Sequence, residues 1–186
     1  MISLTALLLP ALLSAVLVFL MSSIMHMMTK WHAGDFSRLP DEDGVLAALR
    51  PFNLAPGEYV APRPKDMKDM GSPEFKAKAA KGPIVMLNVR PNGQTGMGKQ
   101  LGLWFAYSAV IGLFAGYVSS RAVGMGSDRM LVFKFVASIA FGAYALGLVQ
   151  TSIWYGRSWV TTIKSTIDGV IYGALTGAAF MWLWPR

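Results

Sequence analysis

Two lysines and one aspartate lie inside apolar stretches of the chain, where a charged side chain needs a partner. Lys134 falls in the apolar run 130–155, and Lys164 and Asp168 fall in the run 159–184. An unpaired charge inside a membrane is costly, so such residues are candidates for function. Lys164 and Asp168 are four residues apart and can pair along one helix face. The pattern indicates either a structural ion pair or a protonatable transport site at Asp168.

His26 is the deepest histidine of the N-terminal apolar run and lies between Met25 and Met27. An imidazole inside a membrane can ligate haem iron or the magnesium of a chlorophyll-type pigment. No other apolar run contains a histidine, so this chain by itself does not supply two facing imidazoles for a haem. We expect His26 to be a structural or interhelical hydrogen-bonding residue and predict no bound cofactor, with histidine–methionine ligation left open.

Three methionines and a second histidine repeat at helical spacing in the same region. Met21, Met25, Met28 and His32 follow an i, i+4, i+7, i+11 pattern, which puts them on one face of a continuous helix. Thioether and imidazole ligands suit copper(I). Methionine is also a common flexible filler of packed helices. We favour this second interpretation and predict no metal site.

Small residues recur every fourth position in three of the apolar runs. Glycines at this spacing share a helix face and let a second backbone approach closely, which is how many membrane helices associate. The glycines concerned are Gly112, Gly116, Gly142, Gly169, Gly173 and Gly177. Their spacing predicts tight helix packing, either within the chain or against a partner protein.

The composition places the chain in a membrane. Of its 186 residues, 54% are hydrophobic and only 15% are charged, with a mean hydropathy of +0.44. The net charge of +7 comes from residues spread along the chain, many of them beside apolar runs, which favours membrane topology over nucleic-acid binding. The chain has no cysteine, which excludes disulfides, thiolate nucleophiles, iron–sulfur ligation and covalent c-type haem attachment.

Four apolar runs are long enough to cross a hydrocarbon core of about 30 Å. They cover residues 2–28, 101–120, 130–155 and 159–184. The first run has no lysine or arginine before Lys30 and stays apolar for more than 20 residues, so we interpret it as a retained membrane helix and not as a cleaved signal. The expected domains are a first transmembrane helix (1–29), an extramembrane segment (30–100) and a bundle of three transmembrane helices (101–186).

The segment between the first two runs contains signals for short elements. A helix is predicted within 36–53 and another within 72–83, where Ser72 can cap the helix and Pro73 can start it. A strand is predicted at 83–89, and a weaker strand near Tyr59 can pair with it. The predicted fold class is an all-α membrane protein, a four-helix transmembrane bundle with a small α+β extramembrane domain between helices 1 and 2.

Flanking positive charges predict the orientation. Six basic residues lie near the membrane ends on the side of the long segment, against three on the opposite side. The six are Lys30, Arg38, Lys81, Arg90, Lys99 and Arg157, and the three are Arg121, Arg129 and Arg186. Because basic residues concentrate in cytoplasmic loops, we expect a cytoplasmic segment 30–100 and both termini on the outer, periplasmic side.

Several motifs together resemble those of a known group. They are the Trp-His pair after the first run, the segments FSRLPDEDGVLAALRPFN and PIVMLNVRPNG, and the closing SIWYGRSWVTTIKSTIDGVIYGALTGAAFMWLWPR. In these motifs the chain resembles a group of small bacterial multi-pass membrane proteins with no assigned activity, over most of its length. The resemblance implies a location in the bacterial inner membrane and implies no catalytic residue.

The sequence lacks the phosphate-binding glycine loops, nucleophile elbow and zinc-protease motif of common enzymes, so we expect no enzymatic activity. Our leading expectation is an integral-membrane accessory or scaffold subunit, with membrane lipid and other integral-membrane subunits, or a second copy, as its partners. The alternative, from a different class, is a small transporter or channel that uses Asp168 as a protonatable site.

Overall fold

The computed structural model describes residues 2–93 and 96–186. Within them, four helices are long and apolar enough to cross a membrane: Leu4–Met28, Gly98–Ala122, Arg129–Tyr155 and Trp159–Leu183. The chain is therefore a multi-pass membrane protein. Its residues form two compact units, Met1–Ser37 with Met97–Arg186, and Arg38–Gly96. Each unit is described below by itself.

The first span ends earlier than its methionine pattern suggests. Helix α1 (Leu4–Ser23) starts after Ser3, whose hydroxyl accepts from the backbone of the first turn, and it closes in a π-helical turn at Ile24–Met28. Beyond Met28 the backbone becomes extended. His32 therefore lies in a loop and shares no helix face with the three methionines, which removes the basis of the copper(I) pattern.

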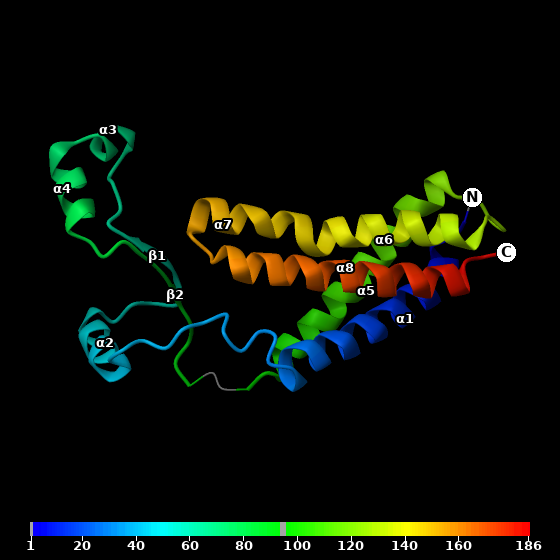
Figure 1. Cartoon of the computed structure of the whole chain (residues 1–186), viewed down its shortest axis with the longest axis horizontal. Coiled ribbons are helices and arrows are strands. Elements are labelled where there is room, and N and C mark those ends of the chain that lie inside the picture. The colour runs from blue at the N-terminus through cyan, green and yellow to red at the C-terminus, as the bar shows by residue number, and fades with distance from the viewer. Residues whose placement is uncertain (1, 94–95) are drawn as a thin grey trace. The chain divides into compact units, whose positions relative to one another are not determined.

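The other spans complete a four-helix bundle. They are α5 (Gly98–Ala122), α6 (Arg129–Ala145) continued by α7 (Val149–Tyr155), and α8 (Trp159–Leu183). A 3-10 turn at Leu146–Leu148 separates α6 from α7, so the third span is one continuous path with an interruption. Helix α6 lies along α8, and α1 contacts both α5 and α8 (Figure 1).

Glycines of α8 form its contact surface with α6. A Cβ atom added at Gly173 would lie 2.9 Å from the carbonyl oxygen of Ala137 and 3.1 Å from the backbone nitrogen of Phe141. At Gly177 and Gly169 the same atom would meet the Cβ atoms of Ala137 and Ala145 at 2.8 and 2.6 Å. The two backbones are thus close enough that only glycine fits between them.

The glycines of α5 are also used within the chain. A Cβ atom at Gly112 would lie 3.3 Å from the backbone of Ala11 in α1, and one at Gly116 would overlap the ring of Phe180 in α8. Gly142 is different, because its nearest neighbour is the side chain of Leu146, at an ordinary 3.7 Å in the same span. Five of the six predicted packing glycines therefore lie at contacts between helices of this chain.

The second unit contains the short elements expected between spans 1 and 2. Its helices are α2 (Glu42–Leu49), α3 (Met67–Met70) and α4 (Pro73–Lys81), with a 3-10 turn at Arg50–Phe52. Strands β1 (Gly57–Ala61) and β2 (Val85–Val89) pair antiparallel, with Gly57 opposite Val89. Ser72 caps α4 by accepting from the Phe75 amide at 3.0 Å.

These observations confirm the predicted fold class. None of the described residues between 38 and 96 is buried, so the second unit has no apolar core of its own in the part that the structure describes.

Candidate functional site

Asp168 is a buried carboxylate whose partners come from the loop that follows the first span. Only 3% of the residue is exposed. Its Oδ1 accepts a hydrogen bond from the indole Nε1 of Trp31 at 3.0 Å, and its Oδ2 lies 2.7 Å from Nε2 of His32. Both contacts join residues more than 130 positions apart. They fasten the loop after span 1 to the side of α8.

His32 connects Asp168 to a second carboxylate. Its Nδ1 lies 2.7 Å from Oδ2 of Asp35, and Oδ1 of Asp35 accepts from the Lys164 ammonium at 3.2 Å. The order Lys164, Asp35, His32, Asp168 is therefore a continuous hydrogen-bonded chain, which we call the relay. Both imidazole nitrogens face carboxyl oxygens, so both contacts are hydrogen bonds when each ring nitrogen carries a proton, or when one nitrogen does and the carboxyl group that faces the other nitrogen is protonated.

Lys164 and Asp168 do not form the predicted ion pair along α8. Lys164 contacts Asp35, whereas Asp168 contacts His32 and Trp31. The spacing of four residues does put both side chains on one helix face, but the loop inserts a carboxylate and an imidazole between them. Each charge of α8 is thus neutralised from the loop and not from its own helix.

Asp35 lies outside the membrane-spanning helices, and its pKa is set by two opposing effects. Burial alone would raise the pKa, because desolvation penalises the charged carboxylate. Hydrogen bonds from His32 and Lys164, with their positive charges, outweigh the burial and hold the pKa of Asp35 below its usual value of 3.8. The relay therefore stabilises Asp35 in its ionised form.

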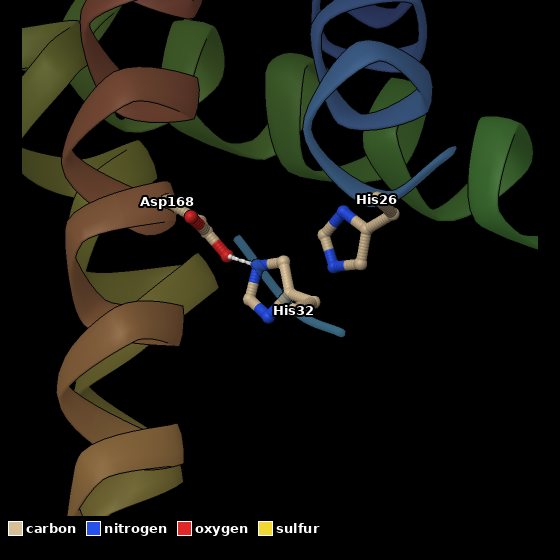
Figure 2. Close-up of side chains that lie close together, drawn as sticks. All are labelled: His26, His32 and Asp168. Carbon is tan, nitrogen blue, oxygen red and sulfur yellow. Dashed lines mark hydrogen bonds and ion pairs between the residues drawn. The ribbon is translucent and has the colours of Figure 1, made fainter. Parts of the chain in front are cut away.

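His26 lies against the relay without joining it. Its Nδ1 lies 3.0 Å from the carbonyl oxygen of Ser22, to which it can donate, and its ring stacks on that of His32 with centroids 4.1 Å apart and planes 9° apart (Figure 2). The hydrogen bond lies within its own helix and is not the interhelical bond that the sequence suggested as one possibility. The structure also places His26 beside His32, which the sequence did not predict.

His26, His32 and Asp168 bring potential ligand atoms within 4.8 Å of one another. Two features distinguish the group from a preformed zinc site. Parallel stacked rings direct their nitrogen lone pairs side by side and not toward a common point. Moreover, His32 and Asp168 approach to 2.7 Å, a hydrogen-bond distance, whereas two ligands of one tetrahedral zinc ion are about 3.3 Å apart. The geometry is that of proton-sharing groups.

A cavity of about 440 Å³ opens beside Asp168 within the bundle. His26 and Ser22 line it from the first span, and Arg157 lines it from the connection between α7 and α8. Four aromatic rings form much of its wall: Trp104, Tyr107, Tyr144 and Tyr172. They come from α5, α6 and α8, and neighbouring rings lie 5.5 to 6.2 Å apart between centroids. The site is thus a largely apolar chamber with one buried carboxylate.

Two tyrosine hydroxyls in this wall have no hydrogen-bond partner among the described residues. Tyr144 is 8% exposed and Tyr172 is 4% exposed. Ser108 and Thr176 lie near the hydroxyl of Tyr144, and Ser22 lies near that of Tyr172, but none of these contacts has hydrogen-bond geometry. Both hydroxyl oxygens are buried away from the cavity as well as from solvent.

Other residues singled out from the sequence lie elsewhere. Lys134 is exposed on α6 and is not part of the relay. Sequence reasoning missed Trp31 and Asp35 as site residues, together with the aromatic wall. The signal for the first two was the segment TKWHAGD, which puts an indole, an imidazole and a carboxylate within five residues at the end of a span.

Comparison of the chain with protein-family models, with curated proteins and with solved structures gives no match in any of the three. No family is identified by this route, so the functional argument rests on the geometry of the site.

Proposed function

We propose that this protein is a small membrane transporter in which the movement of a small molecule is coupled to a proton held by Asp168 and His32. One observation carries the proposal. Asp168 belongs to a proton-sharing relay and at the same time lines a cavity inside the membrane bundle. A buried ionisable group that faces both a proton partner and a binding chamber is the arrangement that proton coupling requires.

Charge counting supports this coupling. The relay contains two carboxyl groups, one ammonium group and one imidazole, so its charges sum to zero only when the imidazole or one carboxyl group holds an additional proton. Loss of that proton leaves one uncompensated negative charge in a region of low dielectric constant, where it interacts strongly with its surroundings. The protonation of the relay and the charge of any molecule in the cavity therefore depend on each other.

The test is proton movement in proteoliposomes that enclose a pH-sensitive dye. Three probes of similar size are added outside in turn: benzyltrimethylammonium, benzyl alcohol and benzylsulfonate. We expect at least one probe to drive proton movement through the wild-type protein, and we expect Asp168→Asn to abolish it. Asp43→Asn, which removes an exposed carboxylate from α2, is the matched control and retains the wild-type rate. The proposal would be refuted if none of the three probes drove proton movement, or if Asp168→Asn left the proton movement unchanged.

A second candidate, an accessory subunit of a larger membrane complex, is favoured by a different observation. No described residue of segment 38–96 is buried. Large apolar side chains are exposed there, among them Phe52 (71% exposed), Met67 (81%) and Ile84 (68%). A protein partner would cover such side chains. The glycine spacing no longer argues for this candidate, since five of the six glycines already pack within the chain.

Purification from the native membrane in a gentle detergent separates the two candidates. Mass spectrometry that finds a stoichiometric membrane protein with the wild-type chain, and loses it when Phe52, Met67 and Ile84 are all changed to Ser, would establish the subunit role. A homogeneous preparation of this chain alone would leave the transporter as the better description. Neither candidate includes a catalytic step.

A further inference from the structure

We infer that the cavity binds an organic cation, and that the cation takes the place of the proton in the relay. The inference rests on the proposed function and specifies its substrate class. The cavity must select a ligand by the groups that line it, and these include four aromatic rings and one buried carboxylate. Each of them favours a positively charged group with an apolar body.

Aromatic rings attract cations through the negative electrostatic potential of their faces, and the effect grows when water is excluded. Trp104, Tyr144 and Tyr172 are mutually in contact, with centroid separations of 5.5 to 6.1 Å, and all three line the cavity. Their rings also supply apolar surface for the body of a ligand. A chamber of this composition is typical of sites for ammonium groups that carry hydrocarbon substituents.

The charged and titratable groups around Asp168 make the binding dependent on protons. On the side of the first span these are His26, His32 and Asp35, and on α8 they are Lys164 and Tyr172. Tyr107 and Tyr144 face the cavity from α5 and α6.

Arg157, from the connection between α7 and α8, adds a positive charge to the lining, and its hydrogen bond from Nη2 to the neutral Ser165 hydroxyl at 3.1 Å does not cancel this charge. With the additional proton in place, the relay is neutral. When this proton leaves, the relay has a charge of −1 and Asp168, which keeps its hydrogen bond from Trp31, can attract a cation. One cation therefore replaces one proton.

The test measures equilibrium binding of benzyltrimethylammonium to the purified full-length protein in detergent, by calorimetry and tryptophan fluorescence. This probe has a fixed charge, so any dependence on pH reports the protein. We expect binding at about pH 8.5 and a decrease of about tenfold per pH unit on the acid side, as exchange of one cation for one proton requires. Calorimetry in two buffers of different ionisation enthalpy should count about one proton released per cation bound.

Asp168→Asn should weaken the binding at least about tenfold and remove its pH dependence, because it deletes the charge that attracts the cation. Tyr144→Phe with Tyr172→Phe keeps the rings and should weaken the binding less, without changing the proton count. Asp43→Asn is the control with unchanged binding.

The outcomes separate the inference from the proposed function. Binding of the cation with proton release, but without flux in proteoliposomes, would support the inference and refute transport. Proton flux driven by benzylsulfonate or benzyl alcohol, with no binding of benzyltrimethylammonium, would support transport and overturn the cation assignment. Cation binding that is independent of pH and of Asp168 would also overturn it.

Discussion

Individual side chains in the relay carry more than one structural role. His32 satisfies Asp35 and Asp168 at the same time, with one ring nitrogen for each carboxylate. Removing the imidazole would leave two carboxylates without their shared partner, and an uncompensated buried charge typically destabilises a protein by about 3–5 kcal/mol. The imidazole that the two carboxyl groups share is therefore also the group that holds the loop on α8.

Acidification should release the loop through Asp35. Because the pKa of Asp35 is lowered in the folded protein, ionised Asp35 contributes stability that is fully present above the unfolded pKa of about 3.9. This contribution is lost as the pH falls through the lower, folded value. We expect wild type to be more stable than Asp35→Asn near neutral pH, and the difference to start to shrink below about pH 4 and to disappear below the folded pKa of Asp35.

Thermal unfolding of both proteins in nanodiscs, followed across this pH range, measures the difference. Glu58→Gln, which changes an exposed carboxylate in β1, should show no such convergence with wild type. A stability difference between wild type and Asp35→Asn that persisted unchanged at low pH would contradict the role given to Asp35.

At the scale of the helices, the contact between α6 and α8 depends on Gly173 and Gly177, which face backbone carbonyl groups of α6. Substitution of Gly173 by Ala places a methyl group 2.9 Å from the carbonyl oxygen of Ala137, and a backbone carbonyl cannot turn away as a side chain can. We expect Gly173→Ala to destabilise the bundle by about 1–3 kcal/mol, the usual cost of overpacking.

Gly142→Ala is the matched control in the neighbouring span. Its added methyl group meets only Leu146 at 3.7 Å, so the substitution should be neutral or stabilise α6 by up to about 1 kcal/mol through helix propensity. Unfolding in a denaturing detergent would measure both variants. Equal losses of stability in the two would show that the close contact at Gly173 does not limit packing.

Local signals in the sequence predicted most of the elements. The four apolar runs, the Ser72 cap of α4 and the pairing of the strands at Tyr59 and Val85–Val89 all appear in the structure. Such signals depend on residues close in sequence. The end of the first span at Met28 agrees with the predicted run 2–28, whereas the turn at Leu146–Leu148 was not predicted, because no proline, and no glycine with a positive φ, marks it.

The candidate site was predicted only in part, because the residues of the relay are distant from one another in sequence. Asp168 and Lys164 were identified because charges are rare in apolar runs. Their partners lie more than 125 residues away in a polar loop, where a histidine or an aspartate is unremarkable. Likewise, Trp104, Tyr144 and Tyr172 are ordinary membrane aromatics until three helices bring them together. Residue spacing does not contain this information.

At the scale of the whole molecule, the orientation in the membrane is a prediction from charge. We expect the termini outside and segment 38–96 in the cytoplasm, since six basic residues flank the spans on that side against three on the other. The chain has no cysteine, so single cysteines can be introduced without background. A membrane-impermeant maleimide applied to intact cells should label Arg186→Cys and should label Lys76→Cys only after lysis. The reverse pattern would invert the topology.

The partners of Asp168 and Lys164 come from residues 31–35, which belong to no helix. Breaking these hydrogen bonds requires no membrane helix to tilt, slide or unwind. Helices α6 and α8, in contrast, are held in close contact by their glycines. Loop motions occur within nanoseconds to microseconds, and collective helix motions take microseconds to milliseconds. Residues 31–35 can therefore separate from α8 quickly while the contact between α6 and α8 stays in place.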